Sequence, residues 1–399
     1  MRVLNSIGGE LRQDDEDDYR SRACGWLREH FPAEWRPDRV GYCPPTFEAQ
    51  RNWERLLYEG GFAGFSWPKE YGGQGLTVRE QLICNEEFGR IGMPDSVNGI
   101  GKDMIGPIIL ALGNEDQKHR FLRRILSMQD IWCQAFSETE AGSDLAAVKT
   151  RATRDGNEWV INGAKTWTSF AQHAHWSLVL ARTGDPQQKR GGLSLFAVPM
   201  SSSGIAVSQI SQIDGRANFC DVRFSNVRIS EDMVLGGIGE GWSGVGRVLG
   251  VERAINRMYR AALFENELRH LVAVCRADAA LRVCLEDMFY VQRIAACYED
   301  IEVLRRLVRS TVQSLIRGGE IGSVGSLIKL HWSEAHQRIV RLSREVLGRA
   351  TRPISTIVGQ AVGRFNTLYL RSRAETIQAG ASEIQLDVIA DRILSLPRE

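Results

Sequence analysis

Glu252 is the acidic residue whose spacing best fits a catalytic role. Apolar residues recur at helical spacing along segment 244–263, at Val245, Val248, Leu249, Ile255, Tyr259 and Ala262. The i, i+3, i+4 rule places Glu252 in this stripe, so its carboxylate is predicted on an inward helix face without a basic neighbour on that face. Such a carboxylate is expected to have a raised pKa, which suits a general base near neutral pH. The pattern equally allows a carboxylate bonded to an arginine from another helix.

Two stretches in the middle of the chain could bind a flat or phosphorylated ligand. Residues 132–144, WCQAFSETEAGSD, place small and acidic residues after an apolar start, which offers backbone N–H groups and a hydroxyl to a ligand. In residues 161–170, INGAKTWTSF, Trp167 and Ser169 are predicted on one face of a strand, where they could flank a planar ring. The alternatives are an ordinary surface turn, and a core tryptophan beside a serine with its own partner.

A loop near the C-terminus, Thr376 to Gln385 (TIQAGASEIQ), interrupts a helical pattern with small residues. Ser382 followed by Gln385 predicts a capping box, so a helix is expected to begin at that serine. Free N–H groups and the dipole at a helix N-terminus favour anionic or polar ligand atoms. The stretch is therefore interpreted as a ligand loop rather than an idle hinge.

Three regions with different periodicity must position these residues. Apolar residues recur at helical spacing from about residue 16 to 130, with a loop at 67–75 (WPKEYGGQG). From about 132 to 235, Asp155-Gly156 and Asn162-Gly163 predict hairpin turns. Further strands are predicted at 176–182, 193–199, 205–210 and 220–229. Strands without helices between them predict an antiparallel sandwich or barrel, and the pattern from about 243 onward predicts a helical bundle.

Residues 239–244, GEGWSG, have the spacing of a dinucleotide-binding loop. That interpretation requires a βαβ unit and a parallel sheet, whereas the strands predicted before this stretch are antiparallel. The stretch is interpreted as a flexible joint between the strand region and the last helical region.

The composition argues against several classes of protein. Of 399 residues, 43% are hydrophobic and 25% charged, and the formal net charge is +1, which does not favour nucleic-acid or membrane-surface binding. No run of about 18 apolar residues predicts a membrane span, and no secretory signal is recognisable. The eight cysteines include no CxxC pair, which favours reduced thiols in a cytoplasmic protein over disulfides or a zinc site.

Four stretches, in this order, resemble the acyl-CoA dehydrogenase family of flavoproteins. WCQAFSETEAGSDLAAVKTRA is similar to the family's first signature, and WVINGAKTWTS to its flavin-contacting strand. NFCDVRFSNVRISEDMVLGGIGEGW is similar to the exit from its β-domain, and GASEIQLDVIADRIL to its second signature. The WPKEYGG loop and the terminal LPR are most like the branch common in actinobacteria.

The resemblance implies an α+β multidomain fold, with an N-terminal α-helical domain (1–131), a central antiparallel β-barrel or sandwich (132–242) and a C-terminal four-helix bundle (243–399). It implies FAD as the cofactor, no metal, and α,β-dehydrogenation of an acyl thioester carried by CoA or a carrier protein. A carboxylate removes the α-proton while the β-hydrogen leaves as hydride to flavin N5. An electron-transfer flavoprotein as electron acceptor and a homodimer, homotetramer or heterotetramer are further expectations.

The resemblance also carries site residues over by position. Cofactor contacts fall on Gln134, Phe136, Ser137, Ser143, Trp167, Ser169, Arg276, Glu345, Gly348, Ala381 and Glu383. Substrate contacts fall on Ser143, Arg253 and Gly380. Glu345, Gly348, Ala381 and Glu383 are expected where a neighbouring subunit meets the FAD.

The sequence departs from the family pattern in its motifs. Thr139 and Glu140 replace the proline and glycine usual in the first signature, which puts the shape of that turn in question. The RxxFG motif that commonly reaches the partner's FAD is missing, because RADAALR, from Arg276, has no Phe-Gly.

The position of the base differs as well. Many members carry the catalytic glutamate directly before the glycine of the second signature, where this chain has Ala379. Another branch carries it in a Glu-Arg pair on the first helix of the C-terminal domain, and Glu252-Arg253 matches that position. Glu252 is therefore predicted to be the base. The alternatives are a diverged flavin oxidase or monooxygenase of specialised metabolism on the same fold, and a non-catalytic subunit that completes a partner's FAD site.

Overall fold

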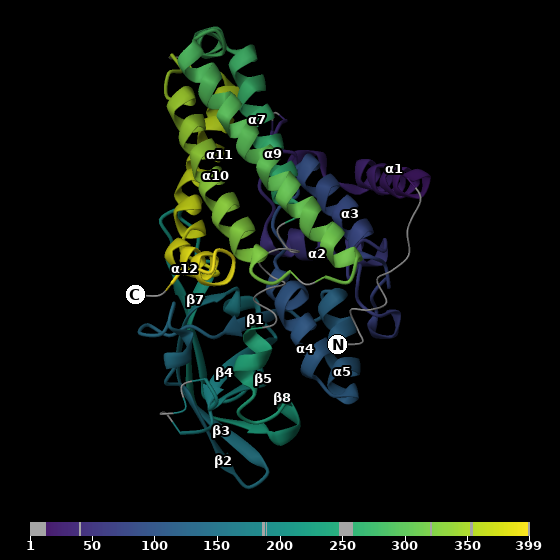
Figure 1. Cartoon of the computed structure of the whole chain (residues 1–399), viewed down its shortest axis with the longest axis vertical. Helices are drawn as coiled ribbons and strands as arrows, with labels where there is room; N and C mark the ends of the chain where they lie inside the picture. The colour runs from purple at the N-terminus through teal and green to yellow at the C-terminus, as the bar shows by residue number, and fades with distance from the viewer. Residues whose placement is uncertain are drawn as a thin grey trace. The chain divides into compact units, whose positions relative to one another are not determined.

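The computed structural model describes residues 13–39, 41–185, 188, 190–246, 258–319, 321–351 and 354–397. The chain divides into two compact units. One, which we call the bundle unit, is drawn from Met1–Pro45, Leu76–Pro94 and Arg253–Glu399; the other, the sheet unit, is drawn from Thr46–Gly75 and Asp95–Glu252. Helices precede and follow a central sheet along the chain, which confirms the α+β class (Figure 1). The domain boundaries 1–131, 132–242 and 243–399 stay predictions.

Long helices that run alongside one another form the bundle unit (Figure 1). They are α7 (Arg260–Ala277), α9 (Met288–Ile316), α10 (Val324–Leu347) and α11 (Thr356–Glu375), with α12 (Ser382–Arg392) packed against α10. The short α8 (Ala279–Arg282) and η8 (Val283–Leu285) lead from α7 to α9. In α10 the residues Ile328, Trp332, Ala335 and Ile339 repeat at helical spacing and are buried, which places this helix in the core of the unit.

The N-terminal third of the chain contributes two helices to the same unit. These are α1 (Gln13–His30) and α3 (Val78–Ile91), with η1 (Ala33–Trp35) after α1. Thr77 and Glu80 form a capping box at the start of α3, and Gly92 ends that helix with a left-handed φ of 72°. Helix α3 packs against α7 and α9. None of the helices that the structure describes combines the length and apolar content needed to cross a membrane.

One eight-stranded sheet organises the sheet unit. Its strands are β1 (Trp132–Ala135), β2 (Arg151–Asp155), β3 (Glu158–Ser169), β4 (Trp176–Arg182), β5 (Leu193–Pro199), β6 (Ile205–Ile210), β7 (Phe219–Ser230) and β8 (Val234–Leu235). The order is β6-β7-β3-β2-β4-β5-β8, with β1 paired to β4. Most pairs are antiparallel as predicted, but β4 pairs in parallel with β1 and with β2. Parallel pairing is possible there because long connections separate these strands along the chain.

One of the two predicted hairpin turns forms and the other does not. Asp155-Gly156 closes the β2–β3 hairpin, with Gly156 at a φ of 61°. The turn predicted at Asn162-Gly163 is wrong, because this dipeptide lies inside β3. There the pairing of β3 with β7 shifts register between Ile161 and Gly163, with the extra residue on β7, so β3 continues through the dipeptide as a strand. A Cβ at Gly163 would lie 2.4 Å from Thr150 Oγ1, which explains the glycine without a turn.

Helices and a glycine-rich loop complete the sheet unit. The helical elements are α2 (Phe47–Glu59), η2 (Lys69–Tyr71), the π-helical η3 (Gly101–Ile105), α4 (Gly106–Leu112) and α5 (Glu115–Leu126). The loop at 67–75 forms as predicted, and its Trp67 ring packs onto the backbone of Gly106, where a Cβ would lie 1.9 Å from the ring. Phe121 of α5 meets Trp132 of β1 edge to face at 5.1 Å. The Phe121–Trp132 contact packs α5 onto β1, the strand with which the first signature begins.

The glycines of residues 239–244 serve close packing against β5. Gly239 N donates to Ser194 Oγ at 2.8 Å, and a Cβ at Gly241 would lie 2.9 Å from the Leu193 carbonyl oxygen. A close approach between two backbones therefore accounts for these glycines without a bound nucleotide.

Candidate active site

The predicted base Glu252 and its neighbour Arg253 lie outside the described residues, and α7 begins at Arg260. The other predicted site residues divide between the two units. The sheet unit holds Gln134, Phe136, Ser137, Ser143, Trp167 and Ser169. The bundle unit holds Arg276, Glu345, Gly348, Gly380, Ala381 and Glu383.

The first signature is fixed against β3 through its backbone. Gln134 is half-buried in β1, opposite Leu178 of β4. Just after β1, the Phe136 carbonyl accepts a hydrogen bond from Lys165 Nζ at 2.9 Å, and the Ser137 carbonyl accepts one from Thr166 N at 2.9 Å. The structure therefore brings Phe136 and Ser137 to the strand that carries Trp167 and Ser169.

The unusual residues Thr139 and Glu140 still allow a tight turn. Glu138 N donates to the Ala141 carbonyl at 3.1 Å, and Ala141 N donates back to the Glu138 carbonyl at 3.0 Å. The Glu140 carboxylate pairs with Lys149 at the surface. Beyond the turn, Ser143 is exposed and available to a ligand. The turn therefore closes without the proline and glycine that are usual in the family.

A buried ion pair beneath this turn was not predicted. Lys165 Nζ lies 2.9 Å from Glu138 Oε1, and the lysine side chain is fully buried. Burial lowers the pKa of Lys165 to about 8, although the Glu138 charge acts in the opposite direction. Burial opposes the charged form of Glu138, but Lys165 and hydrogen bonds, including one from Thr150 N at 2.8 Å, outweigh it and lower its pKa. The alternation along β3 could have revealed the pair, since Lys165 follows the buried Ile161 at an even spacing.

Trp167 lies at an irregularity of β3 and points into open space. Its φ is 57°, and the register with β7 shifts between Lys165 and Thr168, which interrupts the regular alternation assumed for Trp167 and Ser169. The indole is 59% exposed and meets Phe219 edge to face at 6.0 Å. Ser169 is half-buried, and the buried Thr168 Oγ1 has no hydrogen-bond partner. Left-handed backbone at a bulky residue is strained, and such strain is concentrated at functional sites.

An open hollow of about 840 Å³ follows the end of β3. Its walls include Ala171 and Gln172 of η5 (Ala171–His173), the short turn that comes directly after Trp167 and Ser169. Trp176, Met200 and Gln209 complete much of the lining. A hollow of this size is large enough to take part of a cofactor-sized ligand.

In the bundle unit the predicted cofactor residues form two separate groups. Arg276 is exposed in the last turn of α7, Glu345 pairs with Arg293 of α9, and Gly348 caps α10. The hydrogen bond from Arg293 lowers the pKa of Glu345 although burial opposes it. Glu345 lies about 12 Å further along α10 than Gln337, at 1.5 Å per residue, and Gln337 contacts the start of the second-signature loop. Within one chain, Glu345 of this first group therefore does not reach the loop between α11 and α12.

The second group lies on the loop between α11 and α12. Ala379 and Gly380 both have left-handed backbone, with φ of 55° and 94°. Helix α12 begins at Ser382 as predicted, but the predicted capping box is wrong. The N-cap is Ala381 without a side-chain cap, and the buried Gln385 side chain donates to the Gly380 carbonyl at 3.1 Å. Glutamine is long enough to reach past the first turn, so it fixes the loop instead of capping the helix.

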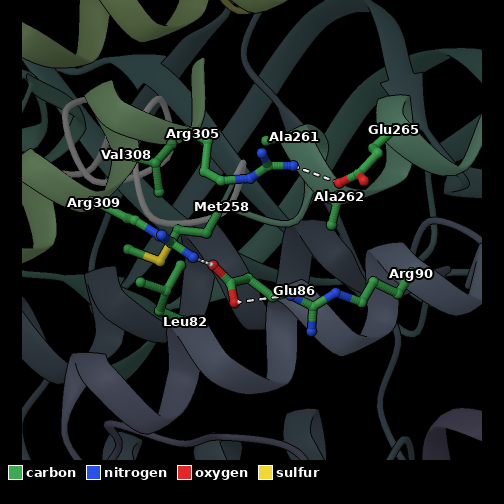
Figure 2. A pocket seen from close by; sticks show the side chains of 10 residues that line it. All are labelled: Leu82, Glu86, Arg90, Met258, Ala261, Ala262, Glu265, Arg305, Val308 and Arg309. Atoms are coloured by element: carbon green, nitrogen blue, oxygen red, sulfur yellow. Dashed lines mark hydrogen bonds and ion pairs between the residues drawn. The ribbon is translucent and has the colours of Figure 1, made fainter. Parts of the chain in front are cut away.

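None of the predicted site residues that the structure describes lines the small pocket between α3, α7 and α9. Figure 2 shows ion pairs across it: Arg309 donates to Glu86 at 3.0 Å, and Arg305 donates to Glu265 at 2.5 Å. Its volume of about 10 Å³ holds at most one water molecule. These contacts join α3 to the bundle and leave no room for a substrate.

Comparison with known proteins agrees with this arrangement along nearly the whole chain. Models for the N-terminal, middle and C-terminal domains of acyl-CoA dehydrogenases match residues 13–129, 133–227 and 239–394. The chain is 35% identical to acyl-CoA dehydrogenase IpdE1 of Mycobacterium tuberculosis, over 96% of this chain and 99% of that protein. Among solved structures, it is similar to the Tcur3481-Tcur3483 steroid ACAD, with 28% identity, coverage of 98% and 99%, and a TM-score of 0.83. The ChsE4-ChsE5 complex from Mycobacterium tuberculosis matches with 26% identity, the same coverages and a TM-score of 0.82.

The chain belongs to the acyl-CoA dehydrogenase family. It is an FAD-dependent oxidoreductase that acts on CH–CH groups, and its relatives are enzymes of lipid metabolism. The resemblance seen in the sequence motifs is thereby confirmed.

The residues at the end of β3 fit a planar cofactor ring. Trp167 offers an exposed indole, and the half-buried Ser169, two residues on, offers a hydroxyl for polar ring atoms. Gly142, in the first signature, has open space around its Cα, so a ligand could approach the backbone there. That individual residues contact FAD stays a prediction. It is supported by the exposure of the Trp167 side chain and by the open space at Gly142.

Replacing Trp167 by alanine is expected to weaken FAD binding about tenfold, because a stacked aromatic ring contributes roughly 0.5–1.5 kcal/mol beyond its buried area. Titration of the apoprotein with FAD, followed by flavin fluorescence, measures this. Val303→Ala is the control, since Val303 is an exposed apolar residue on α9 that is not among the residues assigned to the cofactor. Equal FAD affinity in wild-type protein and Trp167→Ala would rule out a contact between the indole and the flavin.

Proposed function

We propose that this chain dehydrogenates an acyl thioester between its α and β carbons, with Glu252 as the base that removes the α-proton. The observation that carries the proposal is the residue before Gly380. Ala379 stands where many family members have the catalytic glutamate, and its methyl group cannot accept a proton. Glu252-Arg253 stands at the other position known in the family, so the proposed base comes from there.

In the proposed reaction, FAD supplies the acceptor for the β-hydride. The chain's own part is to hold the thioester and to take one proton from its α-carbon, for which the Glu252 carboxylate must lie within hydrogen-bond reach of that proton. Ser143 and the backbone around Gly380 are proposed to hold the thioester, and Arg253 to assist. Trp167 and Ser169 are proposed to flank the cofactor ring, which orients it toward the substrate.

The test of this function is bleaching of the flavin absorbance under anaerobic conditions by a panel of acyl thioesters. The panel contains linear and branched acyl-CoA, a steroid side-chain CoA thioester and carrier-protein thioesters. The steroid compound is included because one similar structure is that of a steroid acyl-CoA dehydrogenase, Tcur3481-Tcur3483. We expect at least one member to bleach the flavin, while acetyl-CoA, which has no β-carbon, does not. A fully flavinated protein that no member bleaches would contradict the proposal.

We further propose that an electron-transfer flavoprotein reoxidises the enzyme and that the chain assembles with a second copy or a related subunit. One similar structure is the ChsE4-ChsE5 complex, which makes co-expression with a related chain worth comparing with expression alone. A cytoplasmic location is proposed as well, since all eight cysteines are free thiols, as in reducing compartments.

A further inference from the structure

The bundle unit contains a cluster of buried charged side chains that the proposed chemistry does not use. Its members are Arg260 and Glu267 on α7, His336 on α10, and Arg364 and Glu375 on α11. All five side chains are at least nine-tenths buried. Buried charges are costly unless they are paired, so each pairing in the cluster calls for a physical explanation.

His336 is the centre of this cluster. Its Nδ1 lies 2.6 Å from Glu375 Oε2, and its Nε2 lies 3.2 Å from Glu267 Oε2. The imidazole also stacks on Phe264, with ring centroids 4.6 Å apart. One histidine therefore bridges two carboxylates: it is hydrogen-bonded to Glu375 on α11, and it is paired by charge with Glu267 on α7, where the geometry is not that of a hydrogen bond.

Two arginines complete the pairing of these carboxylates. Arg260 lies 3.6 Å from the other oxygen of Glu375 and stacks over Trp332 at 4.6 Å. Arg364 lies 3.9 Å from Glu267 and 2.7 Å from His270 Nδ1. The positive groups that act on Glu375 are His336, Arg260 and, from its own helix, Arg371.

The protonation of His336 follows from its neighbours. Burial by itself disfavours the charged ring, but Glu375 and Glu267 outweigh burial and raise the pKa of His336 to about 9. The same contact lowers the pKa of Glu375, although burial opposes its charge. At neutral pH the bridge therefore consists of one imidazolium between two carboxylates.

This bridge ends at the loop of the second signature. Glu375 is the last residue of α11, and the loop Thr376–Ala381 follows it directly. The next residue of α10, Gln337, donates to the Ser372 carbonyl at 2.9 Å and to Thr376 Oγ1 at 3.2 Å. Adjacent side chains of α10 thus hold the last turn of α11 and the first residue of the loop.

We propose that His336 is a positioning residue, which, by bridging Glu267 and Glu375, fixes the end of α11 and hence the conformation of the loop Thr376–Ala381. This inference rests on the proposed function, which assigns that loop to the thioester and the cofactor. Arg260, which also pairs with Glu375, is the first residue of α7, the first helix described after Glu252 in the chain. The cluster therefore ties the start of α7 to the ligand loop.

Stability alone does not account for the cluster. Well-packed apolar side chains of similar volume commonly stabilise a protein as well as, or better than, a buried ion-pair network. What the charged network adds is a defined geometry at the end of α11, where the left-handed residues Ala379 and Gly380 must be held in place.

The central variant is His336→Gln, which keeps a polar side chain but removes the charge between the two carboxylates. The matched control is His270→Gln. His270 is also a buried histidine of the bundle unit, but burial and the charge of Arg364 lower its pKa to about 4, so the control substitution exchanges one neutral group for another. His270 does not contact the end of α11 in the described interactions.

Hydrogen exchange of the full-length, FAD-loaded protein tests the positioning role without relying on turnover. The amides of Gln378 and Ser382 donate to the carbonyls of Ala374 and Thr376 at 2.8 and 2.9 Å, so their exchange reports on the loop. In His336→Gln we expect these amides to exchange about tenfold faster or more, while buried amides of α9 at 301–312 change little. Unchanged loop exchange, or an equal rise throughout the bundle and in His270→Gln, would overturn the proposal.

The activity measurement separates this inference from the proposed function. A displaced loop is expected to slow flavin bleaching about 10–100-fold in His336→Gln, with His270→Gln close to wild type. If no acyl thioester bleaches the wild-type flavin, the proposed function fails, while the exchange pattern still decides the role of His336. If His336→Gln does not fold, Glu375→Gln, which removes the same charge pair from the α11 side, is expected to give the same local exchange pattern, and its failure to do so overturns the proposal.

A pH profile provides a further readout. His336 faces Glu267 on α7 and Glu375 on α11; the charged and titratable groups around these two carboxylates are Arg260 on α7, Arg364 and Arg371 on α11, and His270 against Arg364. Because the folded-state pKa of His336 is raised from 6.5, the stability from this bridge is fully present below about 6.5 and is lost as pH rises through about 9. Loop protection in wild-type protein is therefore expected to fall between about pH 8 and pH 10, and in His336→Gln to be low throughout. The same pH dependence in both proteins would contradict the role of His336.

Discussion

Glu252→Gln is expected to slow flavin reduction by acyl thioester about 10²–10⁴-fold, the usual effect of removing a general base. Glutamine matches the shape of glutamate and can still form hydrogen bonds, but it cannot accept the α-proton. Substrate binding is expected to change much less, because binding does not require proton transfer. Stopped-flow measurement of flavin bleaching at saturating substrate separates the two effects.

Two further proteins sharpen this experiment. Glu286→Gln, at an exposed carboxylate, should bleach at the wild-type rate. The double variant Glu252→Gln/Ala379→Glu places a carboxylate at the alternative family position and is expected to recover part of the lost rate. Normal bleaching by a flavinated Glu252→Gln protein would show that another group removes the proton.

Lys165→Met is expected to lower the free energy of unfolding by about 3–5 kcal/mol, because it leaves the Glu138 carboxylate under the first signature without its buried partner. In a unit of this size that corresponds to a decrease in Tm of roughly 10 °C. The Phe136 carbonyl loses its donor at the same time, so FAD retention should fall as well. Calorimetry and flavin content measure the two effects.

Two control substitutions distinguish the effect of breaking the buried ion pair from the effect of removing a lysine charge in general. Lys149→Met removes the exposed partner of Glu140, and an exposed ion pair contributes little, so Tm should scarcely change. Lys165→Met/Glu138→Gln removes both charges of the buried pair and should be more stable than Lys165→Met alone. A wild-type Tm in Lys165→Met would mean that the pair contributes nothing.

Local patterns predicted much of the fold. The strands expected at 176–182, 193–199 and 205–210 form as β4, β5 and β6, and Asp155-Gly156 makes its hairpin. The turn predicted at Asn162-Gly163 does not form. Its glycine is required because Thr150, from another segment, packs against it, and not because of a local turn. The capping box predicted at Ser382 does not form either, because the Gln385 side chain donates its hydrogen bond to the Gly380 carbonyl.

In the candidate site, too, local patterns predicted some features, while others depended on residues far apart in the chain. Motif order indicated the family and, through it, the cofactor. The apolar stripe of 244–263 singled out Glu252, and Ala379 at the other family position supports its assignment as the base. The alternation of β3 could have indicated the buried Lys165, and the stripe of α10, from Trp332 to Ile339, could have placed His336 inward. Neither pattern predicts the partner of the buried charge. The partner of Lys165 is Glu138, the partners of His336 are Glu267 and Glu375, and all three lie on other elements.

The sequence by itself determined the order of helices, strands and helices, because this order follows from side-chain periodicity. Its motifs indicated the family by resemblance, and the resemblance implied the FAD cofactor. Only the tertiary structure decided the β3 bulge that exposes Trp167, the parallel pairing of β1 with β4, and the bridge through His336. Each of these depends on contacts between residues far apart in the chain. Such contacts are selected by the packing of the whole unit and leave no periodic signal in any single segment.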